Sequence, residues 1–345
     1  MAYYDGTKLL SLKDINGKEP EIYICSTNRS AGKTTYFGRW AVKRFKEYKE
    51  KFCLVYRYNY ELSDIADKFF KELRTLFFPD DTMESKSRAK GIYHELFLNE
   101  QPCGYAVSIN NADQLKKMSH LFSDVSRMIF DEFQSESNHY CDNELMKFQS
   151  LHTSIARGGG KQVRYVPVFM LGNFVSLLNP YYVALGISDT LHSSTKYMRG
   201  DGYVVEQGFN VAAADSQLAS AFNRAFSNSE YVKYASQRVY LNDRTAFIER
   251  PSGSSRYICT LKYEGVEYGI REYPDLGIVY CDNQADISFP LKLVVTTDDH
   301  DINYMMLRKN DVFINQLRFY FEHGAFRFKN LQCKQAVLQV CAYSR

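Results

Sequence analysis

The segment from Glu21 to Lys46 constrains the fold more than any other part of the chain. It opens with the apolar run IYIC, which is typical of a strand, and then breaks into the small polar residues of 26–32. From Thr34 onwards apolar residues recur at helical spacing. A strand, a small-residue turn and a helix that opens at Gly-Lys-Thr form a phosphate site, because backbone N–H groups and the helix N-terminus converge there.

This turn supplies the candidate nucleotide-binding residues. In such a motif Lys33 reaches the outer phosphates and the Thr34 hydroxyl can bind Mg²⁺. The usual pattern has glycine where this chain has Thr27, so a polar turn that contains Gly-Lys-Thr by chance is the alternative. The predicted nucleotide-binding residues are Thr27, Asn28, Arg29, Ser30, Ala31, Gly32, Lys33, Thr34 and Thr35.

Apolar runs that alternate with helical segments predict the rest of this region. The runs are KFCLVYRYN (51–59), GYAVSIN (104–110), SRMIFDEF (126–133) and RYVPVFMLGNF (164–174). A helix is predicted over 60–78, and residues 80–101 are expected to be irregular. Alternating strands and helices predict an α/β fold with a mainly parallel sheet, whose ligand lies along the edge where the strands end.

Two of these strands end in residues that suit phosphoryl transfer. Asp131 is placed to bind the metal on the phosphates, and Glu132 is placed to orient or deprotonate the attacking water. Asn173 can hydrogen-bond that water or the γ-phosphate. The alternatives are two solvated acids at a strand end and a plain Gly-Asn turn. A hydrolytic NTPase needs both a phosphate turn and an acidic pair, so their joint presence favours ATP hydrolysis with Mg²⁺.

The character of the sequence changes near residue 205. Residues 211–236 are rich in Ala and Ser and predict a small helical element. Short strands with turns follow, and then a helix at about 305–323. We therefore expect a P-loop ATPase domain over 1–205, a helical linker over 206–243 and an α+β domain over 244–345.

Composition excludes several other classes of protein. Eight scattered cysteines without a CxxC pair argue against a zinc ribbon or disulfide scaffold and predict reduced, mostly buried thiols. The sequence lacks an apolar stretch of about 18 residues, so no membrane partner is predicted and the chain is expected to be soluble and intracellular. The net charge is only +3, so any contact with nucleic acid must come from local patches.

Several blocks, in the same order across nearly the whole chain, make the sequence resemble the DNA-packaging ATPases (encapsidation proteins) of φ29-like tailed phages, relatives of the large terminase subunits. The blocks are STNRSAGKTT, FCLVYRYNYEL, MIFDEF, LGNFVSLLNPYY, FIER, LVVTTDD with NYMML, and GAFRFKN. GKT and DEF occur in many NTPases, whereas the block at 173–180 and the C-terminal blocks are far more specific.

The resemblance implies a motor that uses ATP to pump double-stranded DNA into a procapsid. Its implied partners are double-stranded DNA, the portal or connector, and further copies of the chain in a ring, which is a pentamer by resemblance. A structural RNA, used by some relatives, is a further candidate partner. The motor is expected to work in the host cytoplasm at the portal vertex and to be absent from the mature virion.

The resemblance also assigns roles to residues. It places Lys33 and Thr34 on phosphate and metal, Asp131 on metal, Glu132 as the catalytic carboxylate, Asn173 as the coupling residue and Arg29 on phosphate.

An arginine finger from the neighbouring subunit is implied as well, because a positive charge supplied in trans stabilises the transition state. Its candidates are Arg157 and Arg164, and the context of Arg157, HTSIAR, fits the helix-end position better. A glycine-hinged basic surface loop is the alternative for both.

A packaging motor holds DNA without reading its sequence, so contacts from Lys and Arg to phosphates should dominate. The predicted DNA-binding residues are Lys86, Arg88, Lys90, Lys116 and Lys117. For Lys116 and Lys117 a solvated helix face is the alternative. The loop at 157–164 is a further candidate.

The resemblance gives the C-terminal domain an RNase H-like fold. Two-metal cleavage requires several carboxylates on one face, and this region shows no strong acidic cluster. The φ29-like relatives that the chain resembles are regarded as having lost the nuclease, so the resemblance implies a vestigial domain that does not cut DNA, docks on the portal or connector and is a further candidate for DNA contact. The alternatives for the whole chain are a nuclease-active terminase, another ring DNA translocase or helicase, or a non-catalytic DNA- or capsid-binding protein with a decayed P-loop, which Thr27 supports best.

Overall fold

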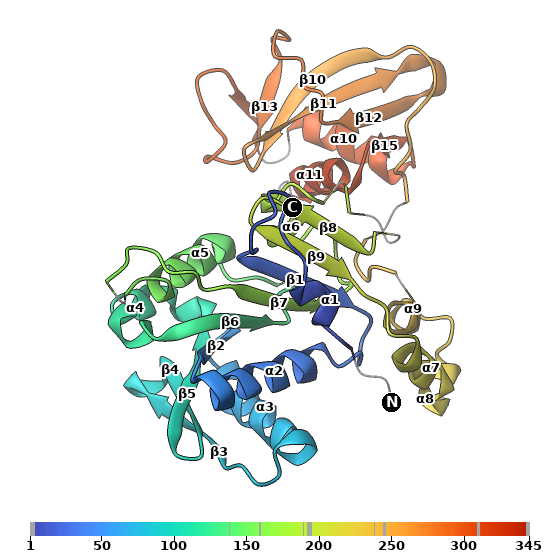
Figure 1. Cartoon of the computed structure of the whole chain (residues 1–345). Helices are drawn as coiled ribbons and strands as arrows, with labels where there is room; N and C mark the ends of the chain where they lie inside the picture. The colour runs from blue at the N-terminus through green and yellow to red at the C-terminus, as the bar shows by residue number, and fades with distance from the viewer. Residues whose placement is uncertain are drawn as a thin grey trace. The chain divides into compact units, whose positions relative to one another are not determined.

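The computed structural model describes residues 4–137, 139–158, 160–188, 190–191, 195–237, 239–243, 246–308 and 311–342, except for the side chains of 64–67. These residues belong to two compact units (Figure 1). The first comprises Met1–Ala184 and Leu191–Asn242, and the second Leu185–Thr190 and Asp243–Arg345.

The first unit is built on one large sheet. Its strands are β1 (Ile22–Thr27), β2 (Lys51–Tyr56), β3 (Met83–Arg88), β4 (Tyr93–Leu98), β5 (Gln101–Ser108), β6 (Val125–Asp131), β7 (Val168–Asn173), β8 (Tyr197–Gly200) and β9 (Tyr203–Gln207). Its helices are α1 (Thr7–Leu10), α2 (Lys33–Tyr48), α3 (Glu61–Phe77), α4 (Ala112–Lys116), α5 (Glu144–Ile155), α6 (Pro180–Ala184), α7 (Val211–Ala219), α8 (Ala221–Ala225) and α9 (Glu230–Ser236).

The nine strands lie in the order β3-β4-β5-β2-β6-β7-β1-β9-β8. Neighbours from β5 to β9 pair in parallel, and only the two edges contain antiparallel pairs. In register, Asn173 of β7 lies opposite Thr27 of β1, and Leu171 of β7 lies opposite Asp131 of β6. The strands that carry the candidate site therefore end side by side, with β7 between the other two.

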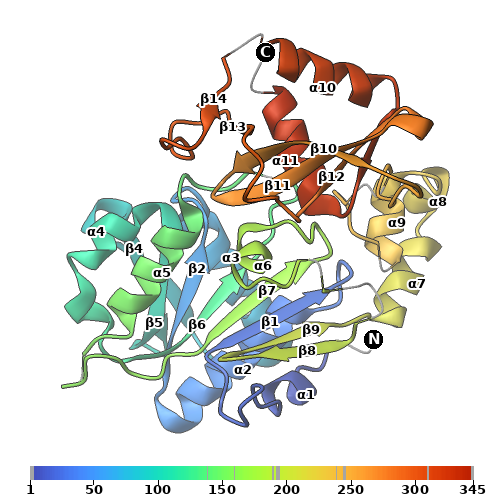
Figure 2. The ribbon, with the colours of Figure 1, turned by 90° about the horizontal axis from the view of Figure 1, so that it is seen from above.

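Helices cover both faces of this sheet (Figure 2). On one face, Phe37 of α2 and Phe69 of α3 pack in the same core as Ile129 of β6. The next residue, Phe130, points to the other face, where its ring centroid lies 5.4 Å from that of Phe148 in α5. Because β1 and β2 are buried on both faces, their sequences are nearly continuous apolar runs without polar alternation.

Two hairpins at the sheet edges differ from the sequence expectations. Residues 80–101 are not irregular, because β3 and β4 form an antiparallel pair there. In β4 the buried positions alternate, with His94, Leu96 and Leu98 inside, but the sequence YHELFL does not alternate apolar and polar residues in the same way. The hairpin of β8 and β9 was not predicted, although its two-residue Asp201-Gly202 turn is a recognised hairpin signal.

The predicted helical element after residue 205 is present as α7, α8 and α9. Asn210 and Ser229 cap α7 and α9, since their side chains accept hydrogen bonds from the N–H groups of Ala213 and Val232. α7 and α8 carry few buried residues, and their sequences are rich in alanine, whereas α9 buries Val232 and Tyr234.

The second unit contains a separate sheet. Its elements are β10 (Arg256–Tyr263), β11 (Val266–Tyr273), β12 (Ile278–Asp282), β13 (Lys292–Val294), β14 (Met305–Met306), α10 (Val312–Glu322), β15 (Phe326–Phe328) and α11 (Leu331–Ala342). The strand order is β14-β13-β10-β11-β12-β15. An antiparallel β10–β11–β12 meander with β13 and β14 added parallel beside β10 is the arrangement expected of an RNase H-like sheet.

The predicted fold class, a mainly parallel α/β domain followed by helices and an α+β domain, is confirmed. The segment AFIER (246–250) is not a strand and makes only an isolated bridge between Ile248 and Phe328. All eight cysteines are buried and free of disulfides. None of the helices in the described part of the chain is long and apolar enough to cross a bilayer.

Candidate functional site

The turn between β1 and α2 has the backbone of an anion site. Ser30 and Gly32 both have positive φ, +59° and +91°, and glycine adopts such a conformation without strain. Among the residues that the structure describes, no side chain caps the start of α2, so the N–H groups of its first turn are available to a ligand. Negative charge is favoured at that point, because the helix dipole and these N–H groups act together.

A cavity of about 380 Å³ opens over this turn. It is lined by Arg29, Ser30, Ala31, Gly32, Lys33, Thr34, Thr35, Glu72, Asp131, Glu132, Gly172 and Asn173. The structure thus brings together most of the predicted residues from three separate strand ends. Glu72 of α3 was not predicted, and its Oε1 accepts a hydrogen bond of 3.2 Å from Thr35 Oγ1.

Lys33 lies at the centre of the site and is almost fully buried. Its Nζ donates to Thr27 Oγ1 and to Asn173 Oδ1, both at 2.9 Å. Burial lowers the pKa of the Lys33 ammonium, and the nearby carboxylates of Asp131 and Glu132 act in the opposite direction. Thr27 occupies the place of the motif glycine but lies outside the cavity lining; its hydroxyl holds the lysine instead.

Thr34 and Asp131 meet across the floor of the cavity. Thr34 Oγ1 donates to Asp131 Oδ1 at 3.2 Å, and the same oxygen accepts the Glu132 N–H at 3.0 Å. Burial raises the pKa of the Asp131 carboxyl to about 6, and the charge of Glu132 adds to this rise, whereas Thr34 and Lys33 oppose it.

One hydroxyl and one carboxylate suit Mg²⁺, which usually takes few protein ligands and shares the rest with phosphates and water. No cluster of three or more His, Cys, Asp or Glu suited to a metal occurs among the described residues.

Glu132 has an unusual backbone. Its φ is +53°, a left-handed conformation that costs a non-glycine residue about 1–2 kcal/mol. Its side chain is exposed at the cavity, and within the described ranges no hydrogen bond to its carboxylate is found. Surrounding contacts must therefore hold this backbone in place.

Gly172 allows the acidic turn to approach β7. A Cβ atom at this position would lie 2.7 Å from Cε1 of the Phe133 ring, too close for any real contact. The Phe133 N–H also donates to the Leu171 carbonyl at 3.2 Å. The Phe133 ring can lie here only because residue 172 is a glycine without a Cβ atom. Neither the LGNF block nor the DEF block reveals this contact on its own.

Two residues of the phosphate turn contact the helices that follow the sheet. Asn28 is fully buried outside the cavity, and its side-chain amide exchanges two hydrogen bonds, of 2.9 and 3.0 Å, with the backbone of Asn210. Arg29 forms an ion pair with Glu136, which also accepts a hydrogen bond of 2.7 Å from Tyr234 in α9. These links were not predicted.

The two arginine-finger candidates differ in their surroundings. Arg157 lies two residues after the end of α5 and is exposed to solvent. Arg164 instead donates to the main-chain carbonyls of Val125 and Ile155, at 2.9 and 2.7 Å. The Arg164 guanidinium is hydrogen-bonded within its own chain, whereas Arg157 is exposed. Of the two candidates for an arginine finger, Arg157 is therefore the better placed to reach another subunit.

The predicted DNA-binding residues lie on separate surface elements. Lys86 and Arg88 belong to the edge strand β3, where Arg88 pairs with Glu95 at 2.9 Å. Lys90 lies in the turn after β3, and Lys116 and Lys117 lie exposed at the end of α4.

In the second unit the acidic residues serve local structure. Asp299 accepts hydrogen bonds from the N–H groups of Glu264 and Gly265, and Asp282 pairs with Arg271 at 3.0 Å. β10, which lies between β11 of the meander and the parallel strand β13, contains no carboxylate.

The sheet is mainly parallel, and one strand, β7, separates β1, which leads into the phosphate turn, from β6, which ends in the acidic pair. This arrangement defines the class of a P-loop NTPase. A family model described as "Podovirus DNA encapsidation protein (Gp16)" matches residues 1–343, and the chain belongs to this family. The resemblance inferred from the sequence is confirmed, and the function of this family is that of a viral DNA-packaging motor ATPase.

Individual relatives agree with this assignment. The chain is 25% identical over 306 residues to the DNA packaging protein of Bacillus phage phi29, covering 88% of this chain and 87% of the relative. It is 24% identical over 308 residues to that of Bacillus phage B103, covering 88% and 90%.

Two solved structures share the fold. A chain of the bacteriophage Phi-29 viral genome packaging motor assembly superposes with a TM-score of 0.76 at 23% identity, and all of both chains is covered. A chain of the Phi-28 gp11 DNA packaging motor gives a TM-score of 0.60 at 16% identity, covering 99% of this chain and 97% of the other.

Proposed function

We propose that this chain hydrolyses ATP with Mg²⁺ in the cavity over the 28–32 turn and uses the energy to move double-stranded DNA through the portal into a procapsid. The observation that carries the proposal is the convergence of Lys33, Thr34 and Asp131 at one sheet edge. A fold that had lost nucleotide binding would not be expected to retain a buried lysine next to a paired hydroxyl and carboxylate.

The residues divide the chemistry between them. Bound ATP and Mg²⁺ supply the transferred phosphoryl group and the charge that neutralises it. Lys33 exchanges its bonds to Thr27 and Asn173 for phosphate oxygens, while Thr34 and Asp131 hold the metal. Glu132 accepts the proton of the attacking water, and this requires a carboxylate directed into the cavity.

Asn173 and Arg29 are placed to report the state of the site. When Lys33 turns to phosphate, the Asn173 amide is free to hold water or to shift. A phosphate near Arg29 competes with its ion pair to Glu136, and the Tyr234 contact passes that change to α9. Asn28 connects the turn to Asn210 at the start of α7. The contacts of Arg29 and of Asn28 therefore both link the phosphate turn to the helices after the sheet.

Assembly completes the motor in this proposal. Arg157 of one subunit enters the site of its neighbour in a ring, for which we propose five copies, and Lys86, Arg88, Lys90, Lys116 and Lys117 hold DNA phosphates. The ring works on the procapsid portal in the host cytoplasm, with a structural RNA as a further candidate partner, and is absent from the mature virion. We assign residues 1–205 to the ATPase domain, 206–243 to the linker and 244–345 to a vestigial domain without nuclease activity.

The test is steady-state phosphate release by the full chain, with and without double-stranded DNA. Glu132→Gln should lower the rate roughly 10²- to 10⁴-fold, the usual contribution of a general base. Lys33→Ala should abolish nucleotide-dependent turnover, and Lys43→Ala, on the exposed side of α2, is the matched control. Unchanged release in both Lys33→Ala and Glu132→Gln would refute the proposal.

A further inference from the structure

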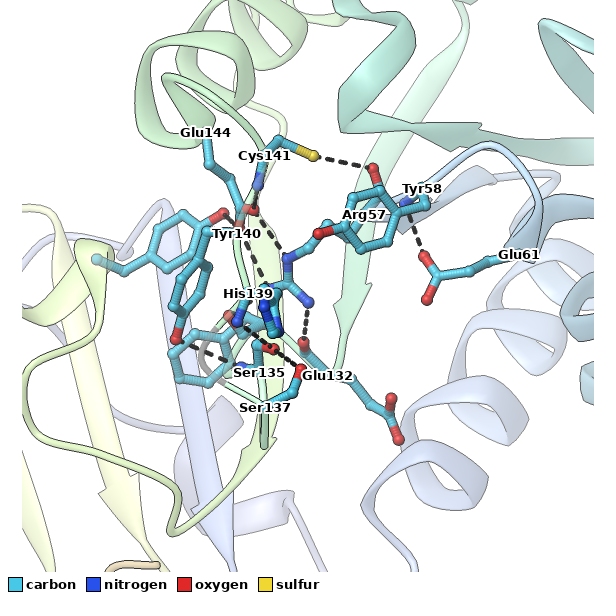
Figure 3. Close-up of polar contacts among 12 residues, drawn as sticks. Arg57, Tyr58, Glu61, Glu132, Ser135, Ser137, His139, Tyr140, Cys141 and Glu144 are labelled. Atoms are coloured by element: carbon cyan, nitrogen blue, oxygen red, sulfur yellow. Dashed lines mark hydrogen bonds and ion pairs between the residues drawn. The ribbon is translucent and has the colours of Figure 1, made fainter. Parts of the chain in front are cut away.

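A buried ion pair of Arg57 and Glu144 lies beside the acidic turn (Figure 3). Neither residue lines the cavity. Arg57 follows β2, and Glu144 is the first residue of α5. Arg57 Nε donates to Glu144 Oε2 at 2.8 Å, and Nη2 donates to Oε1 at 3.1 Å. Their side chains are only 7% and 1% exposed, so the pair is almost completely removed from water.

The guanidinium also binds the main chain of the acidic turn. Arg57 Nη1 donates to the Glu132 carbonyl at 3.2 Å, and Nη2 donates to the Phe133 carbonyl at 2.8 Å. A lysine could not reproduce this pattern, because only the planar fork of arginine presents donors in fixed directions to a carboxylate and two carbonyls together.

Glu144 is itself held by other elements. Its carboxylate accepts the Tyr181 hydroxyl of α6 at 2.8 Å and the Cys141 N–H at 2.8 Å. Together with the bidentate Arg57 contact, these bonds occupy both carboxylate oxygens. Glu144 therefore fixes the direction in which the Arg57 guanidinium points.

The acidic turn needs such support. The Glu132 backbone is left-handed, and its exposed side chain extends away from the Arg57–Glu144 contacts (Figure 3). No side chain in the described part of the protein holds that carboxylate, so the backbone of Glu132, which sets the direction of its Cα–Cβ bond, is the part of this residue that the surrounding structure fixes. The Glu132 N–H donates to the Asp131 carboxylate, and the Glu132 carbonyl accepts a hydrogen bond from Arg57.

We propose that Arg57, oriented by Glu144, is a positioning residue that sets the backbone of Glu132 and thereby aims the catalytic carboxylate. The inference rests on the proposed role of Glu132. It gives a function to an arginine that touches neither nucleotide nor metal ligands.

The experiment compares Arg57→Lys with Arg127→Lys in the full chain. Arg127, in the first half of β6, is a fair control. Its side chain is also 7% exposed, and it is paired with a glutamate, Glu50. Arg57→Lys should lower kcat roughly 10- to 100-fold, the range that follows a misplacement of about 1 Å. Binding of a fluorescent non-hydrolysable ATP analogue should change less than about threefold, and Arg127→Lys should keep both values near wild type.

A double-mutant cycle separates positioning from a general structural effect. In a Glu132→Gln background, Arg57→Lys should change the single-turnover rate less than about twofold, because the carboxylate through which Arg57 acts is already gone. An equal loss in both backgrounds, or a wild-type kcat for Arg57→Lys, would overturn the inference and leave the proposed function intact. Unchanged hydrolysis in the Glu132→Gln single variant would overturn the inference together with the proposed role of Glu132, and a loss of turnover in Lys33→Ala would still support ATP hydrolysis at this site.

If Arg57→Lys does not fold, as judged by thermal unfolding, Tyr181→Phe replaces it in the same cycle. This variant keeps the buried charges and removes one of the bonds that orient Glu144. It should lower kcat without weakening binding of the analogue, again only where Glu132 is present. A loss of the same size in the Glu132→Gln background would overturn the inference.

Discussion

Replacing Gly172 with alanine should damage the site without touching a catalytic group. The added Cβ would lie 2.7 Å from Phe133 Cε1 and 3.0 Å from Cδ1. Carbon atoms in contact lie at about 3.5–4.0 Å, so the ring or the strand must move by about 1 Å. The Phe133 ring is fully buried and packs edge-on against Tyr181 and Tyr182, with centroids 5.8 Å away in both cases, so it has little room to yield.

Two effects should follow from this displacement. Overpacking of this kind costs about 1–3 kcal/mol of folding free energy. A shift of about 1 Å at the acidic turn should also lower kcat by up to about 10²-fold. Thermal unfolding and steady-state ATP hydrolysis measure the two effects separately.

The second-site variant Phe133→Leu provides the control. A smaller side chain gives the new methyl group room, so Gly172→Ala combined with Phe133→Leu should be more stable and more active than Gly172→Ala alone. A Gly172→Ala protein with wild-type unfolding temperature and kcat would refute the argument, since it would show that the turn and β7 are not in tight contact.

Three further predictions concern the site and the second unit. Because the pKa of Asp131 is raised to about 6 in the folded chain, ATP hydrolysis should rise with pH through about 6 as this metal ligand ionises. The same shift means that the nucleotide-free protein loses stability as pH rises from the ordinary carboxyl value to about 6, so Asp131→Asn should unfold at a higher temperature than wild type at pH 7.5 and show no such advantage near pH 4. Mixing Arg157→Ala with Lys33→Ala subunits should restore ATPase activity above that of either alone, because an intact site can then meet an intact finger; no gain on mixing would contradict a finger acting in trans. Full-length protein with Mn²⁺ or Mg²⁺ should leave plasmid DNA intact on an agarose gel, and robust cutting would show that the acids of the second unit do hold metals.

Local sequence was sufficient to predict the elements on which the site is built. The strand, small-residue turn and helix around Lys33, and the apolar run of β6 that ends in two acids, are contiguous sequence patterns. The left-handed backbone of Glu132 is different, because it is held by a contact with Arg57, which is distant in the sequence. Parallel strands place their carboxyl ends at one edge, so alternation of strands and helices was enough to predict that these groups share a site.

Tertiary structure alone decided which side chains support that site. Lys33 and Asn173 are 140 positions apart, and Arg57 and Glu144 are 87 apart, yet each pair is in direct contact. The same holds for Arg164, whose guanidinium satisfies carbonyls of its own subunit. Such contacts depend on which elements pack side by side and on which buried polar groups still lack partners, and neither property is encoded in the spacing of residues along the chain.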